Sequence, residues 1–151
     1  MNVETILRTK GNAVATIRPD QTVGAAVKEL ISRNVGALVV SEDGETVDGI
    51  ISERDIVHGL ADHGAALMSL SVAEMMTRRV VTCKLSDTVD QLMAEMTNRR
   101  IRHFPVVQDG RLCGIVSIGD VVKTRIMQQE HEVDSLRAYV SGGAPDSHAL
   151  V

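Results

Sequence analysis

Two serine–aspartate pairs with the same spacing supply the most suggestive chemistry in this chain. Ser52 precedes Asp55 by three residues, and Ser117 precedes Asp120 by the same interval, each inside a Gly-Ile-x-Ser-x-x-Asp motif. Each aspartate would open a helix directly after a strand, where backbone N–H groups and the helix dipole favour an anion. The aspartate could bind a ligand there, or it could simply cap its helix.

A basic cluster lies between the two motifs, comprising Arg99, Arg100, Arg102 and His103. Arg99 and Arg100 fall near the end of an expected helix, where the dipole favours cations, so we expect at least one of them on a solvated face. His103 has no second ligand at helical or hairpin spacing, so we expect no metal site.

Composition excludes several classes of function. The net charge of −4 argues against broad binding of nucleic acid or of anionic membranes. The apolar runs are too short to span a bilayer, and we expect no signal peptide and a cytoplasmic location. Phe104 and Tyr139 are the two aromatic residues, so base stacking is not available. We expect Cys83 and Cys113 to be buried free thiols.

The motifs belong to an internal repeat. The stretch 16–57 is echoed by 82–122, with an offset of 66 residues up to an Asp-Gly turn and 65 after it. Each copy alone would be marginally stable, so we expect one compact unit of two subdomains. Two copies can pack about a pseudo-twofold axis, and the cleft between them is the natural place for a ligand.

Each copy predicts the element order β-α-β-β-α, which gives a mixed α/β (α+β) fold. Apolar residues at helical spacing predict the first helix of each copy, and Asp-Gly pairs at 43–44 and 109–110 predict hairpin turns. The expected strands cover 13–17, 37–40 and 47–52 in the first copy, and 80–83, 104–107 and 112–117 in the second. The second helices are expected from Asp55 toward His63 and from Asp120 onward.

The segments outside the repeats also carry patterns. Ser71 to Met76 predicts a short helix that docks the second copy, and Val3, Ile6 and Leu7 could do the same for the first. The last helix is expected to run through Arg137, with an apolar stripe that suits a partner helix, formed by Ile126, Val133, Leu136, Tyr139 and Val140. We predict repeats over 1–67 and 68–127 and an extension over 128–151, frayed from Ser141.

This pattern closely resembles the CBS domain pair, or Bateman module. The resemblance covers residues 1 to about 127 and rests on the paired Gly-x-x-Ser-x-x-Asp motifs, the Phe104-Pro105-Val106-Val107 strand before Asp109-Gly110, and the segment 72–77. It implies a regulatory protein that binds an adenosine nucleotide such as AMP, ADP, ATP, NAD or S-adenosylmethionine between its repeats. It also implies a disc-like homodimer of repeat pairs.

The resemblance assigns roles to residues of both copies. Asp120 would bind the ribose hydroxyls, Ser117 the phosphate or ribose, and Arg102 and His103 the phosphate. The adenine slot would be lined by Val81, Thr82, Cys83 and Ile115. The first copy offers Thr16, Ile17, Ser52, Arg54 and Asp55, but Gly36 and Ala37 replace the Arg-His pair. Two clefts of unequal chemistry are expected, with NAD(H) in one and AMP in the other as one hypothesis.

The leading interpretation is therefore a non-catalytic nucleotide-sensing module that signals to an unknown effector protein through a shift in population. A purely structural dimeric adaptor with empty clefts is the alternative. An enzyme is less favoured, because no Gly-rich phosphate loop, metal cluster or nucleophile elbow is present in the sequence. No catalytic cofactor, nucleic acid or membrane partner is expected.

Overall fold

The computed structural model describes residues 1–143 and contains the two predicted repeats. The first repeat comprises β1 (Thr16–Ile17), α2 (Val23–Arg33), β2 (Ala37–Val40), β3 (Gly49–Ser52) and α3 (Glu53–His63). A 3-10 helix, η1 (Gly64–Ser69), and α4 (Val72–Met75) lead to the second repeat, which comprises α5 (Val89–Arg99), β4 (His103–Gln108), β5 (Arg111–Ser117) and α6 (Ile118–Gly143). The N-terminal helix α1 (Val3–Lys10) precedes both.

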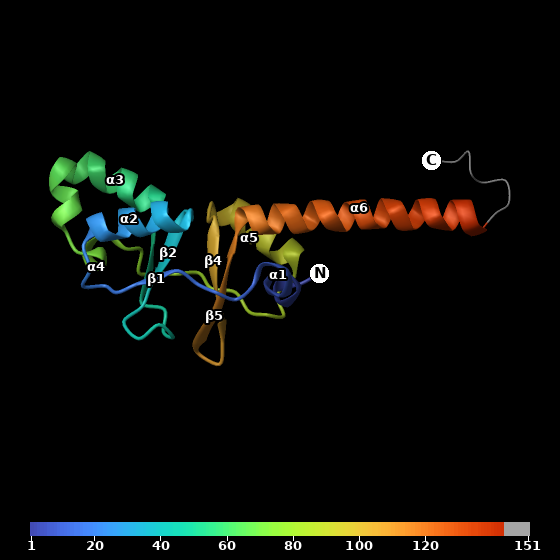
Figure 1. Ribbon diagram of the computed structural model, residues 1–151, viewed down its shortest axis with the longest axis horizontal. Coiled ribbons are helices and arrows are strands. Elements are labelled where there is room, and N and C mark those ends of the chain that lie inside the picture. Colours follow the sequence, from blue (N-terminus) through green and yellow to red (C-terminus); the bar gives the residue numbers. More distant parts are fainter. Residues whose placement is uncertain (144–151) are drawn as a thin grey trace.

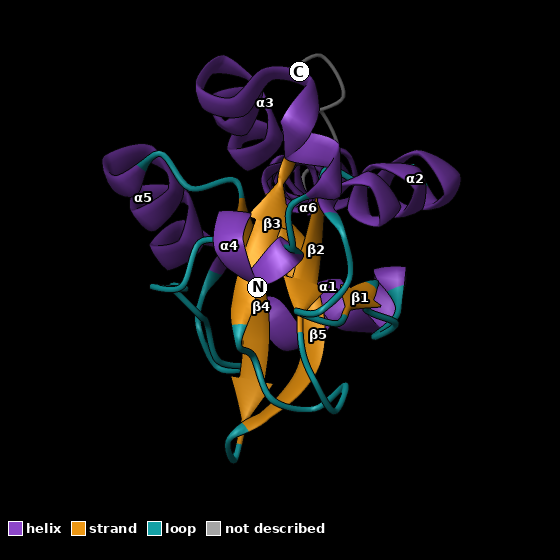
Figure 2. Ribbon diagram, turned by 90° about the vertical axis from the view of Figure 1, so that its left-hand side faces the viewer, coloured by secondary structure: helices purple, strands orange, loops and turns teal. Residues whose placement is uncertain are grey.

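The repeats form two small sheets that lie side by side in Figure 1 and one in front of the other in Figure 2, with helices above and beside them. In the first sheet β1 runs parallel to β2, and β2 pairs antiparallel with β3. In the second sheet β4 pairs antiparallel with β5. The strand expected over 80–83 is reduced to one parallel bridge between Cys83 and Val106, and the strand expected over 13–17 is reduced to β1.

Local signals set the helix boundaries. The Thr22 hydroxyl accepts from the Ala25 amide and begins α2, and the Thr88 hydroxyl accepts from the Gln91 amide and begins α5, in the expected capping box. The Asp-Gly turns differ. At the β4–β5 turn Asp109 and Gly110 both have positive φ, as a two-residue hairpin requires, whereas at the longer β2–β3 loop only the Gly of the pair does.

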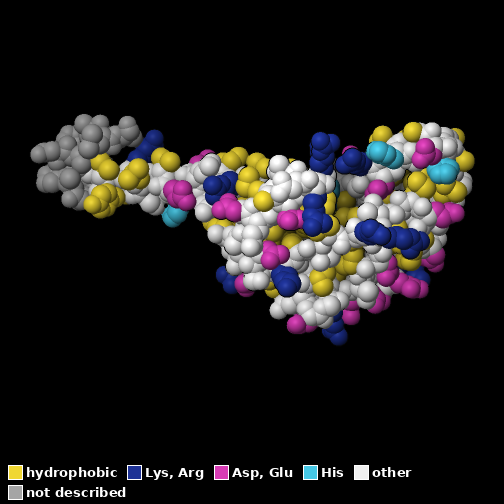
Figure 3. Space-filling view, turned by 180° about the vertical axis from the view of Figure 1, so that it is seen from behind, with side chains coloured by type: hydrophobic (Ala, Val, Ile, Leu, Met, Phe, Trp, Pro, Cys, Tyr) yellow, Lys and Arg dark blue, Asp and Glu magenta, His cyan; other side chains and the backbone are white. Residues whose placement is uncertain are grey.

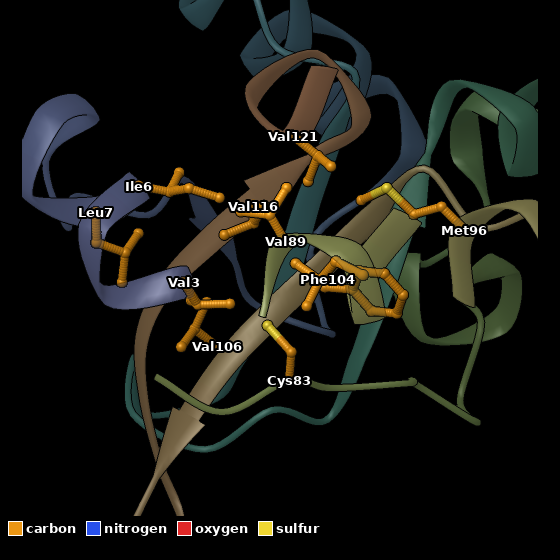
Figure 4. Packing of buried hydrophobic residues seen from close by; sticks show 11 residues of the cluster. Val3, Ile6, Leu7, Cys83, Val89, Met96, Phe104, Val106, Val116 and Val121 are labelled. Atoms are coloured by element: carbon orange, nitrogen blue, oxygen red, sulfur yellow. The ribbon is translucent and has the colours of Figure 1, made fainter. Parts of the chain in front are cut away.

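Each repeat has its own hydrophobic core. Each docking helix packs into the core of the other repeat from the one predicted, α1 into the second and α4 into the first. Val3, Ile6 and Leu7 of α1 pack with Val106 and Val116 in the second repeat (Figure 4). In Figure 1 the blue α1 lies beside β5 and α5, away from α2.

The short helix α4 shows the complementary exchange. Its residues Val72 and Met75 belong to the core of the first repeat, with Val23, Leu38 and Ile51. Both docking predictions were therefore wrong about the partner. A backbone hydrogen bond also joins each segment to the repeat whose core it enters, from Val3 N to Asp87 O and from Val72 N to Gln21 O.

The glycines of the repeated motif, which have no side chain, allow the docking segments to pack closely against the strands. A Cβ atom on Gly49 would lie 2.6 Å from the Met76 sulfur and 2.9 Å from the Thr77 carbonyl oxygen. A Cβ atom on Gly114 would lie 2.7 Å from a methyl group of Leu7. Glycine is required at both positions because a neighbouring segment approaches the strand backbone closely.

The last helix extends well past the folded body (Figure 1). It begins at Ile118 rather than Asp120 and runs to Gly143, beyond the expected end at Arg137. The predicted frayed end from Ser141 is helical at its first three residues, and 144–151 lie outside the described residues. Across residues 1–143, no helix combines the length and hydropathy that a membrane span would need.

Candidate functional site

A cavity of about 760 Å³ lies between the two repeats. The first repeat contributes the end of β3 and the start of α3, and the second contributes the segment before β4. Its volume falls within the range of small-molecule sites, about 300–1,000 Å³. It is lined by Gly36, Ile50, Ser52, Glu53, Arg54, Asp55, His58, Gly59, Asp62, Met75, Thr77, Arg79, Val80, Val81, Arg99, Arg100, Ile101, Arg102 and His103.

Hydrogen bonds fix the position of the Asp55 side chain in the first turn of α3. Its Oδ2 accepts hydrogen bonds from the Ser52 amide at 2.8 Å and the Ser52 hydroxyl at 3.0 Å. Its Oδ1 accepts from the Thr77 hydroxyl at 2.9 Å. The bond from the Ser52 amide and the bond from the Asp55 amide to the Ser52 hydroxyl form a capping box, so Asp55 caps its helix and also presents a carboxylate to the cavity. The two interpretations of the motif are thus compatible.

Five arginines make the cavity basic within an acidic chain. They outnumber the three lining carboxylates, which belong to Glu53, Asp55 and Asp62; the arginines are Arg54, Arg79, Arg99, Arg100 and Arg102. Arg99 pairs with Glu95 at 2.6 Å, while the other four form no ion pair within the described part of the chain. Figure 3 shows basic side chains gathered around a hollow in the body. Such a surface attracts a phosphate or carboxylate ligand.

Arg100 adopts a backbone conformation that is unfavourable for its residue type. It ends α5 in the left-handed region, with φ of 56°, where the first repeat has Asn34 at φ of 53°. Asparagine tolerates this region well, whereas arginine does so at a cost. A strained residue that lines a cavity points to a function for its side chain.

His103 lies where the two repeats meet. A Cβ atom on Gly36 would lie 3.3 Å from Cε1 of His103 and 3.1 Å from Oε1 of Glu53, so the glycine leaves room for the imidazole. Burial lowers the pKa of His103, and Lys10 and Arg102 act in the same direction against the opposing charges of Glu53 and Asp120. His103 is therefore neutral at pH 7 and can donate or accept a hydrogen bond.

Asp120 has a different environment from Asp55. Its Oδ2 accepts a hydrogen bond from the Ser117 amide at 2.9 Å and forms an ion pair with Lys10 Nζ at 2.6 Å. Lys10 Nζ also donates to the Ile115 carbonyl at 2.9 Å. Burial raises the pKa of Asp120, but the hydrogen bonds from Lys10 and Ser117 outweigh it and bring this pKa below its usual value. A side chain of the protein thus neutralises this carboxylate.

The cavity contains only some of the predicted site residues. Ser52, Arg54, Asp55, Val81, Arg102 and His103 line the cavity, whereas Thr16, Ile17, Thr82, Cys83, Ile115, Ser117 and Asp120 do not. Ile17 and Cys83 are buried in the cores of their repeats. The sequence grouped Arg102, His103 and Val81 with Asp120. All three line the cavity that Asp55 also lines, and His103 stays close enough to Asp120 for that carboxylate to act on its pKa. The ligand-binding role of each residue stays a prediction.

Several lining residues were missed, among them Thr77, Arg79, His58 and Asp62. Thr77 and Arg79 follow α4, and the repeat gave no reason to place this connection beside Asp55. Their signal was the short interval between the predicted α4 helix and the second repeat, which forces the connection across the cleft. His58 and Asp62 follow Asp55 at helical spacing on α3, a periodicity that was available but unused.

The remaining reactive residues do not gather at the cavity. Cys83 is buried and Cys113 is half-buried, and neither forms a disulfide. Burial raises the pKa of Cys83 to about 12, so this thiol stays protonated. In the part of the chain that the structure describes, no group of three His, Cys, Asp or Glu side chains is placed to hold a metal ion.

Two β-α-β-β-α repeats with a cleft between them define a tandem-repeat module. The chain belongs to the CBS-domain family, whose model, described as "CBS domain", matches residues 3–62 and 72–126. It is 41% identical over 128 residues to CBS domain-containing protein CBSX3, mitochondrial, from Arabidopsis thaliana. That alignment covers 82% of this chain and 62% of the relative, so the chain spans less than two thirds of that protein.

Solved structures share the fold. The CBS-domain containing protein ATU1752 from Agrobacterium tumefaciens is 48% identical, with a TM-score of 0.80 over 83% of this chain and 99% of that one. The CBS domain pair of protein MJ0100, in complex with 5′-methylthioadenosine and S-adenosylmethionine, is 28% identical, with a TM-score of 0.72 over 82% and 98% of the two chains.

Proposed function

We propose that this chain is a regulatory module that binds an adenosine nucleotide in the cavity between its repeats. The observation that carries the proposal is the meeting of Asp55, on the first repeat, with Arg102 and the other cavity arginines in one ligand-sized space. The complex of the related MJ0100 pair with two adenosine compounds supports adenosine as the ligand class.

Each part of such a ligand has a chemical counterpart in the cavity. Asp55 offers a carboxylate that can accept hydrogen bonds from both ribose hydroxyls, and its position is set by Ser52 and Thr77. The adenine ring can lie against apolar side chains, contributed by Ile50, Met75, Val80, Val81 and Ile101. The phosphates then face the arginines, whose planar donors match phosphate oxygens.

The charge of the cavity favours nucleotides with phosphate groups over S-adenosylmethionine, whose sulfonium is positive. Five arginines would repel a cation and attract AMP, ADP, ATP or NAD. A ligand held by both repeats would bias their relative arrangement, and this shift would pass to an effector partner. The size of the response cannot exceed the difference in affinity between the two arrangements.

Calorimetric titration of the purified chain with adenosine, AMP, ADP, ATP, NAD and S-adenosylmethionine tests the proposal. We expect one site per chain, tighter binding with each added phosphate, and weakening as salt is raised. At a hundredfold excess over its Kd, the best ligand should add about 2.7 kcal/mol to the free energy of unfolding. Failure of every adenosine compound to bind would instead support the structural adaptor with empty clefts.

A further inference from the structure

Within residues 1–143, the distal half of α6 is a helix without a packing partner. Val121 is buried in the core of the second repeat, and Arg125 pairs with Asp90 on α5 at 3.2 Å. Past that point α6 projects from the body, and Figure 3 shows hydrophobic side chains along it. Helices gain most of their stability from tertiary packing, so a projecting helix with exposed apolar residues calls for a partner.

The apolar residues of this segment follow a heptad. The spacing alternates between four and three residues through Val122, Ile126, Gln129, Val133, Leu136 and Val140. The four apolar stripe residues Val122, Ile126, Val133 and Leu136 are between 43% and 63% exposed, so the stripe is open between residues 122 and 136. With a rise of 1.5 Å per residue, the stripe is about 27 Å long.

The residue types at these positions specify the kind of partner. Ile126, Val133 and Val140 occupy the a positions and are all β-branched, while Leu136 occupies a d position. β-Branched residues at a with Leu at d favour a parallel two-stranded coiled coil. Gln129, at a d position, is the single polar residue in the seam, and in register it meets its own counterpart rather than an apolar side chain.

Charges beside the stripe favour a second copy of the same chain. In a parallel pair each g residue faces the e residue of the next heptad on the partner. This places Glu132 opposite Arg137 of the second copy, and Arg125 opposite its Glu130. Both pairs are of opposite charge. Arg125 can exchange its exposed contact with Asp90 at little cost, because surface ion pairs contribute little.

We infer that the distal half of α6 forms a parallel, in-register, two-stranded coiled coil with a second copy of this chain. The twofold axis then runs along the helices and holds the two repeat pairs at the same end of the coil. This contact is separate from any association between the repeat pairs, and it does not depend on the nucleotide site. The helix continues from the folded body, so its first turn is already nucleated.

Cysteine cross-linking in the full chain tests the geometry. Leu136→Cys places two thiols opposite each other only in a parallel, in-register pair, whereas the matched variant Ala138→Cys faces away from the seam. Under mild oxidation we expect covalent dimers with Leu136→Cys, and only the background of the unmodified chain with Ala138→Cys. Equal cross-linking at both positions, or none at Leu136→Cys, would overturn the proposal.

Charge exchange tests the partner. In the Leu136→Cys background, Glu132→Arg or Arg137→Glu should lower the yield of covalent dimer by about 2- to 10-fold, because each puts like charges together twice in the dimer. The double exchange should restore it. A double variant no better than the single variants, or an unmodified chain of about 16.3 kDa across a concentration series, would contradict a self-paired coil. Thermal unfolding of the body should be unchanged in all of these variants.

Discussion

Asp55 and Asp120 show that one motif can have two environments. Both aspartates accept from the amide of the serine three residues earlier, and both stand at the start of a helix. They differ in what a distant segment brings to them. The Thr77 hydroxyl donates a hydrogen bond to Asp55 beside a basic cavity, whereas Lys10 supplies a fixed cation to Asp120. The role of each carboxylate is therefore set by its neighbours rather than by the motif.

Replacing Arg100 should raise the stability of the protein and weaken nucleotide binding. Replacing it with Asn, the residue at the matching place in the first repeat, relieves the left-handed backbone and should raise the free energy of unfolding by about 1 kcal/mol. The same change should weaken binding of ATP, because a cavity cation is lost, and leave adenosine binding unchanged. Urea unfolding and calorimetry measure the two effects. A variant of higher stability with unchanged ATP affinity would remove Arg100 from the site.

The Lys10–Asp120 pair should give stability that depends on pH. The pKa of Asp120 is lower in the folded protein than in the unfolded chain. The stabilisation is therefore full above pH 5 and is lost as the pH falls through the folded pKa of Asp120. Lys10→Met should lower the free energy of unfolding by about 0.5–1 kcal/mol at pH 7, and the two proteins should converge as the pH falls below the folded pKa of Asp120. Lys84→Met, at an exposed lysine, is the control. A difference that does not depend on pH would contradict the pair.

At the scale of elements, the repeat in the sequence predicted most of the fold. Helix starts at Thr22 and Thr88 and the hairpins around the Asp-Gly turns followed from local chemistry. The docking of α1 and α4 could not be assigned in this way. Both have an apolar face of the same kind, and only long-range packing decides which core receives which helix.

Ile6 tests the docking of α1 on the second repeat. Its side chain is 3% exposed in that core, so Ile6→Ala should lower the free energy of unfolding by about 2–5 kcal/mol. Hydrogen exchange should rise first in β4 and β5. Ile31→Ala is a matched control on α2, because that side chain is 75% exposed and its loss should cost no more than about 0.5 kcal/mol. Increased exchange confined to the first repeat would place α1 elsewhere.

The two motif glycines should differ in tolerance. Gly49→Ala would press on the carbonyl of Thr77, which cannot move freely, and should cost about 2–3 kcal/mol of unfolding free energy. Gly114→Ala meets only the methyl groups of Leu7, which can change rotamer, and should cost about 1 kcal/mol. Thermal or urea unfolding compares them. The reverse order would mean that α1 is the more rigidly docked segment.

At the scale of the whole molecule, the site depends on the way the chain crosses between repeats. The internal repeat predicted a cleft, and the sequence identified Asp55, Arg54 and Arg102 as candidates. It could not predict that Arg102 and His103 would line the same cavity as Asp55, because this follows from the packing of one repeat on the other. The two pseudo-symmetric aspartates thus have different neighbours, Thr77 for Asp55 and Lys10 for Asp120.

The most direct test of this account compares Asp55→Asn with Asp120→Asn in calorimetric titrations with AMP, ADP and ATP. Both variants lose a carboxylate from the same helix-start motif, so the second controls for capping. We predict that Asp55→Asn weakens binding by about 10- to 100-fold, as expected for lost hydrogen bonds to a charged group, while Asp120→Asn stays within about twofold. Loss of binding only in Asp120→Asn, or no binding by the unmodified chain, would contradict the assignment of the nucleotide site to this cavity.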